Sequence, residues 1–504
     1  MPRWSSTRSI RTLASCMILL VAGTLALAQR TSNTPIRIGV GALTDTMDPH
    51  ACASTLCFTS FYAVYDALTR IDENGNAQPA LAASWSTIDD VTWEFRLRPD
   101  AKFHSGENLT SADVVATIER LIDPNKTLPA SGRIATVKSA YAVDDLTVRI
   151  VTSTADPILL GRLSVVFILR ASDIAGGTTN SANGTGAWRV SSFRPGEALT
   201  LDAFDESWRG APASPRVIIT SLPEDSSRVA ALQAGDVDLV QNLPIDFLGL
   251  LEAQGFQVAA PQLGSIQMVN LSSTRGAPLD DRRVRLALNY AVDREALFNS
   301  ILGGRGSLAD GQMIGPDGVG HNPAVSAYPY DPELARRLLA EAGYPDGFSI
   351  RWDGPSGAYI QDRATQEAIV AQLSQVGVKV DLNFMEQGAF IDGLLKGTLA
   401  PMSFLNWNYF PIMDADFVYN WFQSSNGTKI YANPQFDELF GASRRAVDAT
   451  VRVDLLDQLA QITHDDPTGI YLFHPPDVFG LAAGVRGFTG RPDSVIWLDD
   501  LRLE

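Results

Sequence analysis

The order of apolar and polar residues along the chain predicts an α/β protein. Residues 36–40 alternate between apolar and polar, as a half-buried strand does, and residues 225–234 have the pattern of a helix. That helix lies between expected strands at 217–222 and 237–240, and the order strand, helix, strand is typical of an α/β lobe. Further strands are expected at 93–97, 139–152 (a pair), 187–192, 198–203, 348–352, 378–384, 470–473 and 495–498, and further helices at 58–68, 111–121, 280–292, 331–343, 366–376, 436–446 and 450–462.

The first 28 residues have the pattern of an export signal. Arg3, Arg8 and Arg11 precede an apolar run at 13–27, which is too short to span a bilayer comfortably and ends in small residues. We therefore predict cleavage after Ala28 and a periplasmic mature protein. We expect no stable membrane insertion, because no later stretch is long and apolar enough to span a membrane.

The three cysteines leave one question open. Cys16 stands in a sequence that resembles a lipoprotein box, but the apolar segment follows this cysteine instead of preceding it, so we expect no lipid attachment. Cys52 and Cys57 remain after export. An oxidising compartment permits a disulfide between them, whereas a helix through both would place them on different faces. Both a disulfide and two free thiols are compatible with the sequence.

Charge and length limit the possible functions. The formal net charge of −17 becomes about −20 when a signal with three arginines and no acid is removed, and such a surface repels nucleic acid. About 475 mature residues exceed one ordinary hydrophobic core, so more than one lobe is expected. Residues 176–186 are rich in Gly, Ser, Thr and Asn, which is typical of a linker.

Aromatic residues are concentrated at 404–422, around a proline and several Asn and Asp residues. A mostly apolar wall with a few fixed polar groups is how pockets for small organic ligands are built. The alternative is that this segment belongs to the hydrophobic core, as most aromatic clusters in large chains do.

Motifs spread over nearly the whole chain after the signal resemble one family. The chain resembles the extracellular solute-binding proteins of ABC importers, of the peptide, opine and nickel class. The matching segments are 46–50, 65–68, 79–82, 93–98, 103–106, 109–114, 184–188, 228–235, 281–285, 287–294, 338–347 and 431–437. Each motif alone is weak, and their order and spacing together carry the resemblance.

The resemblance implies an α/β fold of the periplasmic-binding-protein type, a type II Venus flytrap with two lobes, one of which carries an extra inserted domain. The expected divisions are 1–28 for the signal peptide, 35–67 with 181–272 and 475–504 for the first lobe, 68–180 for the inserted domain, and 273–474 for the second lobe. Two crossings between lobes would form a hinge, and a ligand held by both lobes would stabilise the closed form.

The resemblance also places the aromatic segment in the cleft. In peptide binders of this family an Asp three residues after the matching Trp holds the ligand amine, and here that residue is Phe410. Some members carry an Arg three residues before the Trp, and here it is Phe404. Both differences remove charge, which argues against a simple peptide unless Asp414 or Asp416 replaces the missing acid. The segment 353–359, with Asp362 and Arg363, resembles members that take opines, glutathione or other amino-acid and sugar conjugates.

The residues expected to contact the ligand come from several segments. Arg363 and Arg133 could each bind a ligand carboxylate, or Arg363 could pair with Asp362 or Glu367. The full expected set is Trp407, Asn408, Tyr409, Phe410, Phe404, Arg363, Tyr359, Gln361, Arg133, Thr55 and Met47.

Other functions are less consistent with the sequence. The five histidines have no metal-ligand spacing, so we expect no metal site and no cofactor, although a nickel or metallophore carrier of the same fold stays an alternative. No motif of an exported hydrolase occurs, and we expect no enzymatic activity. The expected function is a monomeric periplasmic protein that captures a peptide-like solute and delivers it to an ABC permease. A sensory receptor as partner cannot be separated from a permease by sequence.

Overall fold

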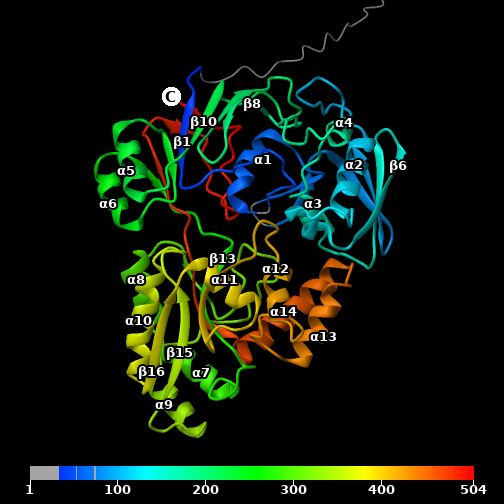
Figure 1. Cartoon of the computed structure of the whole chain (residues 1–504). Coiled ribbons are helices and arrows are strands. Elements are labelled where there is room, and N and C mark those ends of the chain that lie inside the picture. Colours follow the sequence, from blue (N-terminus) through cyan, green and yellow to red (C-terminus); the bar gives the residue numbers. More distant parts are fainter. Residues whose placement is uncertain (1–32, 53, 73–74) are drawn as a thin grey trace, which may run out of the picture.

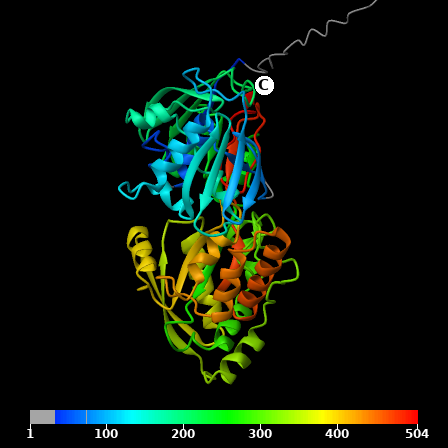
Figure 2. The same cartoon turned by 90° about the vertical axis from the view of Figure 1, so that its right-hand side faces the viewer.

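The computed structural model describes residues 33–52, 54–72 and 75–504 of the chain, and they form two lobes joined at a narrow waist (Figure 1). The expected signal peptide, with its cleavage after Ala28, lies outside the described residues. Turning the molecule shows that the first lobe is itself made of two units, one of which stands above the last helices of the second lobe (Figure 2).

A seven-stranded mixed sheet forms the centre of the first lobe. Strand β1, Ile36–Val40, pairs in parallel with its neighbours on both sides. The strand order is β12 (Gln257–Ala259), β19 (Phe479–Leu481), β11 (Leu239–Gln241), β1, β10 (Arg216–Ser221), β9 (Ala198–Ala203) and β8 (Trp188–Arg194). Its helices are α1 (Phe58–Val64), α5 (Asp225–Ala234) and α6 (Leu248–Ala253). The sheet therefore takes strands from near both ends of the described chain.

A separate four-stranded antiparallel sheet is built entirely from chain that lies between β1 and β8. Its order is β4 (Ala82–Asp89), β5 (Thr92–Leu97), β7 (Thr147–Thr152) and β6 (Val137–Asp144), and it packs with α2 (Ser111–Ile122) and α3 (Leu159–Leu163). Helix α4 (Ala171–Ala175) lies against α2. A short pair, β2 (Thr69–Ile71) and β3 (Ala77–Pro79), leads into it. This second unit of the first lobe has a hydrophobic core of its own.

The second lobe is built on a six-stranded mixed sheet. Its order is β14 (Ser307–Leu308), β18 (Gly469–His474), β13 (Ser265–Leu271), β17 (Met402–Asn408), β15 (Phe348–Pro355) and β16 (Val378–Met385). The helices of this lobe are α7 (Arg282–Tyr290), α8 (Arg294–Leu302), α9 (Pro332–Glu341), α10 (Asp362–Ser374), α11 (Gln387–Leu395), α12 (Asp416–Tyr419), α13 (Pro434–Ser443) and α14 (Ala449–Asp465). Carboxylates begin several of them: Asp281 caps α7 and Asp331 caps α9, each accepting a backbone N–H of the first turn.

Two expected elements differ from the structure. The helix expected at 58–68 ends at Val64, where the carbonyl of Val64 accepts the N–H of Gly186 and a Cβ on Gly184 would lie 1.9 Å from the same oxygen. Residues 495–498, where a strand is expected, lie within the described chain and form no strand. Their apolar residues are buried against the first-lobe core, and the N–H of Ile496 is donated to the Thr59 hydroxyl, so burial and not sheet pairing explains the pattern.

The two connections between the lobes run side by side. The chain leaves the first lobe after β12 and returns to it after β18. Leu263 donates its N–H to the carbonyl of Pro475 at 2.9 Å, and Asp477 donates its N–H to the carbonyl of Pro261 at 2.8 Å. This antiparallel pair of short segments is the waist of the molecule, and it has the form of a hinge between two packed bodies.

Candidate ligand-binding cleft

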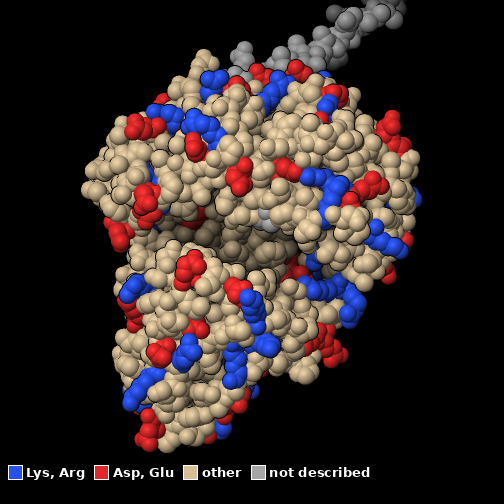
Figure 3. Space-filling view, in the orientation of Figure 1, with Lys and Arg blue, Asp and Glu red and all other residues tan. Residues whose placement is uncertain are grey.

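A hollow lies between the two lobes, and most of the residues visible inside it are uncharged (Figure 3). Two cavities in this region take residues from both lobes. The first, which we call the amide cavity, has a volume of about 850 Å³. Its walls are Asp225, Arg228, 242–246, Leu263, Gln267, 356–364, Glu367, Asn406, 475–478 and Ser494.

One wall of the amide cavity is the loop at 356–361, and the carboxylate of Asp362 binds the backbone of this loop. Asp362 is buried and accepts backbone N–H groups from Gly357, Ala358, Tyr359 and Arg363, at 3.0, 2.8, 3.0 and 2.6 Å. Because these bonds occupy both oxygens of Asp362, the carboxylate orders the loop and is not free to bind a ligand. Burial raises the pKa of the Tyr359 hydroxyl in this loop to about 12.

Both arginines of the amide cavity also have partners. Arg363 pairs with Glu367 at 2.9 Å and lies over the ring of Phe384. Arg228 is buried and bonded to Asp225 and to backbone carbonyls. The cavity is therefore polar, and its cations are already neutralised by neighbouring carboxylates.

A buried acid lies beside the hinge at the first-lobe wall of this cavity. The carboxylate of Asp477 accepts hydrogen bonds from the Gln241 amide at 2.7 Å and from the Ser494 hydroxyl at 2.6 Å. Burial raises the pKa of Asp477 to about 6, and the two donors only partly oppose that shift.

The second cavity, which we call the arginine cavity, has a volume of about 590 Å³ and lies between the four-stranded unit and the second lobe. Its walls are Phe58, Pro129, Gly132, Arg133, 135–136, 154–158, Arg162, Val165, 411–412, 416–417, 420–421, Arg444 and Arg452. Four arginines thus line one cavity.

Three of these arginines have carboxylate partners. Arg452 binds Asp414 through two hydrogen bonds of 2.8 and 2.7 Å. Arg444 binds Asp416, and Arg162 lies 3.5 Å from the same Asp416 and 3.7 Å from Asp156. Because Arg162 belongs to the first lobe and Asp416 to the second, this ion pair also joins the two lobes across the cleft.

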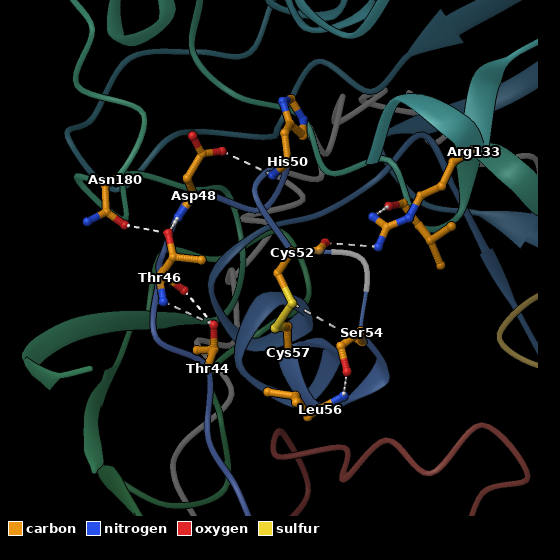
Figure 4. Close-up of a disulfide and its surroundings, with 11 residues drawn as sticks. Thr44, Thr46, Asp48, His50, Cys52, Ser54, Leu56, Cys57, Arg133 and Asn180 are labelled. Atoms are coloured by element: carbon orange, nitrogen blue, oxygen red, sulfur yellow. Dashed lines mark hydrogen bonds between the residues drawn. A yellow bond between two sulfur atoms is a disulfide. The ribbon is translucent and has the colours of Figure 1, made fainter. Parts of the chain in front are cut away.

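Arg133, the fourth arginine, bonds only to backbone carbonyls among the described residues. It donates to Val165 at 2.7 Å and to Cys52 at 3.1 Å, and Figure 4 shows the second of these bonds. Its guanidinium lies over the ring of Phe58. Burial lowers the pKa of Arg133 to about 10. The side chain remains a cation at neutral pH, and no carboxylate compensates its charge.

The Cys52 carbonyl belongs to a short disulfide loop. Cys52 and Cys57 are bonded, so of the two states left open by the sequence the structure has the disulfide. Cys52 precedes the first helical turn, which begins at Thr55 after the cap residue Ser54, so one helix does not run through both cysteines.

The expected ligand contacts fall into two groups. Tyr359, Gln361 and Arg363 line the amide cavity and Arg133 lines the arginine cavity. Thr55 lines a third, smaller cavity of about 180 Å³ in the first lobe, which shares Asn242 and Ser494 with the amide cavity. These residues line cavities of the cleft, and their contact with a ligand stays a prediction.

The remaining expected residues line none of these three cavities. Met47, Phe404, Trp407, Tyr409 and Phe410 are buried. The Trp407 indole N–H is donated to Asn270 at 2.9 Å, and the Tyr409 hydroxyl to Asp317 at 2.9 Å. Asn408 is half-buried and accepts a hydrogen bond from Asn406. In this structure, most of the aromatic segment packs as core, and a direct ligand contact by these residues stays a prediction.

Sequence reasoning missed several cavity residues. Side chains alternate along β17, so Leu405 and Trp407 face the aromatic core while Asn406 faces the amide cavity. Gln267 is the direct cross-strand partner of Asn406 and lines the same cavity. The period of two along 402–408 could have identified Asn406, whereas Gln267 depends on the register between β13 and β17.

Comparisons with known proteins agree with this architecture. Residues 76–429 match the model of the bacterial extracellular solute-binding proteins, family 5. The chain belongs to this family. It is 28% identical over 473 residues to heme-binding protein A of Haemophilus influenzae, which covers 85% of each chain. It is 27% identical over 489 residues to the glutathione-binding protein GsiB of Pectobacterium atrosepticum, which covers 92% of this chain and 93% of that protein.

A solved structure gives the same fold. The binding protein AgaA of A. tumefacien R10, in complex with agropinic acid, matches with a TM-score of 0.74 and 26% identity, over 94% of this chain and 99% of that chain. The protein is thus a two-lobed, type II solute-binding protein with mixed α/β content.

Two further features bear on partners. Within 33–52, 54–72 and 75–504, no group of three or more His, Cys, Asp or Glu residues is arranged to hold a metal ion. No helix in these same ranges is long and apolar enough to cross a membrane.

Proposed function

We propose that this protein is the periplasmic component of an ABC importer and that it captures a peptide-like solute between its lobes. The observation that carries the proposal is the hydrogen-bonded pair of connections at 260–264 and 474–478, beside cavities that take their walls from both lobes. A ligand that contacts both walls stabilises the closed arrangement of such a hinge, and a permease can then distinguish loaded from empty protein.

The proposed domain boundaries largely follow the sheets to which the strands belong. The proposed first lobe comprises 35–67, 181–272 and 475–504, the inserted domain 68–180, and the second lobe 273–474. Three of the four boundaries separate strands of different sheets. The boundary at 272 does not, because β13 (Ser265–Leu271) belongs to the second-lobe sheet, and the connection at 260–264 lies before it. The proposed export signal at 1–28 would deliver the mature chain to the periplasm, where it acts as a monomer without enzymatic activity.

The ligand proposed is an oligopeptide, an opine or a glutathione-like conjugate, and the ion pairs of the arginine cavity narrow this choice. Phe410 stands where peptide binders carry an acid, and Asp414 and Asp416 are the acids nearest in sequence that could replace it. Asp414 is bound to Arg452 and Asp416 to Arg444. Neither acid is available to hold a ligand ammonium group, so a simple peptide with a free amine fits less well than an opine or a conjugate.

The proposed ligand contacts are the cleft residues Tyr359, Gln361, Arg363, Arg133 and Thr55, supported by their place in the cavities. The relatives named above bind heme, glutathione and agropinic acid according to their names, and two of these ligands are amino-acid derivatives. A peptide-like ligand is consistent with these relatives and with the amide-rich wall formed by Gln267 and Asn406.

A thermal-shift screen of the mature protein tests the proposal. The panel contains dipeptides, tripeptides, glutathione, agropinic acid, sugar conjugates and nickel, and calorimetry then measures the affinity of each hit. We expect an opine or glutathione-like compound to raise the melting temperature, because a ligand that binds only the folded protein stabilises it by mass action. A response to nickel alone, or to no organic compound of the panel, would contradict the proposal.

A further inference from the structure

The arginine cavity has an uncompensated positive charge. Four arginines line it, and three carboxylates accompany them: Asp156, Asp414 and Asp416. The nearby cation Arg120 does not change this balance, since it is neutralised by Asp48 at 2.5 Å. Among the described residues that line or accompany this cavity, the excess cation is Arg133.

Arg133 has donors that remain available to the cavity. A guanidinium has five N–H groups, and Arg133 uses two of them in the hydrogen bonds to Val165 and Cys52. These two bonds and the stacking on Phe58 fix the plane of the group. The remaining donors form a rigid fork, which matches the two oxygens of a carboxylate better than it matches a single acceptor.

The walls around Arg133 are largely apolar. The second lobe contributes Pro411, Ile412, Phe417 and Trp421 to the same cavity. Phe417 is 45% exposed, although it is a large apolar side chain, and it has no place in the aromatic core of its lobe. Phe417 and Arg133 line the same cavity, so a ligand with an apolar and an anionic part could contact both.

We propose that Arg133 forms a carboxylate-binding subsite, and that the ligand carries this carboxylate on an apolar group that contacts the second-lobe wall. The inference rests on the proposed function, because it assigns a part of the ligand to one end of the same cleft. Closure would then place the apolar group between the inserted domain and the second lobe, next to the Arg162–Asp416 ion pair that joins them.

The disulfide is part of this subsite as a positioning element. The carbonyl that accepts from Arg133 belongs to Cys52, and the bridge to Cys57 ties Cys52 to the start of α1. Phe58, the ring under Arg133, is the first residue of that helix. One short segment therefore supplies two of the three contacts that orient the guanidinium.

Paired probes test the proposal without knowledge of the natural ligand. Phenylpropionate and phenylpropionamide have the same ring and nearly the same shape, and only the first carries a carboxylate. Ligand-detected NMR and competition between the two measure their affinities for the mature protein. We expect phenylpropionate to bind at least about tenfold more tightly than the amide, because a charge-assisted bidentate pair is stronger than a neutral hydrogen bond.

Variants then assign the preference to one residue. Arg133→Gln should remove the preference for phenylpropionate and leave phenylpropionamide binding unchanged, and the amide probe thereby reports whether the cavity remains folded. Arg133→Lys, which keeps the charge without the fork, should retain only part of the preference. The matched control is Arg216→Gln, which removes an arginine that is paired with Asp202 and lines neither cavity, and it should leave the preference intact.

The possible results test the carboxylate subsite and the proposed function independently of each other. Equal affinity for the two probes, or a preference that survives Arg133→Gln, would overturn the carboxylate subsite. If instead the probes behave as expected while no peptide, opine or glutathione-like compound stabilises the protein, the subsite stands and the proposed class of solute is wrong.

Discussion

The amide cavity and the arginine cavity lie in the same cleft but handle charge in opposite ways. In the amide cavity the loop carboxylate of Asp362 is occupied by backbone N–H groups, and Arg363 is neutralised by Glu367. In the arginine cavity Arg133 keeps its charge without a carboxylate. On our proposal, polar parts of a solute belong in the first cavity and its carboxylate belongs in the second.

The largest expected effect is a difference in stability between variants of two arginines in the arginine cavity, one of which is paired with a carboxylate. Arg452→Met leaves the buried carboxylate of Asp414 without its partner and should lower the free energy of unfolding by about 4 kcal/mol. Arg133→Met leaves no carboxylate unpaired and should cost about 1 kcal/mol, the net value of a hydrogen bond or two. Urea denaturation of both variants measures the difference. Equal losses would mean that Arg133 has a structural charge partner after all.

The second prediction concerns the acid in the amide cavity. Burial raises the pKa of Asp477 to about 6 in the folded protein, from the ordinary value of 3.8. Between these values the unfolded chain loses this proton while the folded protein keeps it, so this group lowers stability as the pH rises from about 4 to about 6. Asp477→Asn removes that loss and should make the protein more stable at pH 7 by up to about 3 kcal/mol, with no gain near pH 3.5.

Urea denaturation at several pH values measures this dependence. The control is Asp225→Asn, because Asp225 also lines the amide cavity but is exposed and bonded to Arg228. A gain for Asp477→Asn that is the same at every pH would contradict the assignment of the titration to this carboxyl group.

The smallest expected effect comes from the disulfide beside Arg133. Replacing Cys52 and Cys57 by Ser should lower the free energy of unfolding by about 2 kcal/mol, the value that loop-closure entropy gives for so short a loop. The same variant should weaken phenylpropionate binding and not phenylpropionamide binding, because the Cys52 carbonyl no longer has a fixed position. Unchanged carboxylate preference would show that Val165 and Phe58 orient Arg133 without the bridge.

Most strands and helices could be predicted from the sequence because local forces decide them. The strand at 36–40 and the helix at 225–234 have the predicted bounds, and the helices expected at 280–292 and 331–343 begin directly after the caps Asp281 and Asp331. The expectation at 495–498 was wrong because an apolar run can be buried without joining a sheet.

The cleft was harder to predict because long-range pairing decides its walls. Trp407 is expected in the cleft because it is aromatic, but the pleat of β17 directs its side chain toward Asn270 and the core. Its neighbour Asn406 faces the cavity instead. The unpaired charge of Arg133 depends on carboxylates that are distant in sequence, and each of these binds another arginine. No local pattern contains that information.

The central claim is that the solute is held between both lobes, with its carboxylate on Arg133. A crystal structure of the mature protein with the tightest compound from the screen tests it most directly. The account predicts a ligand that contacts residues of both lobes, with a carboxylate within hydrogen-bond distance of the Arg133 guanidinium. A ligand bound to one lobe alone, or one whose carboxylate lies away from Arg133, would contradict it.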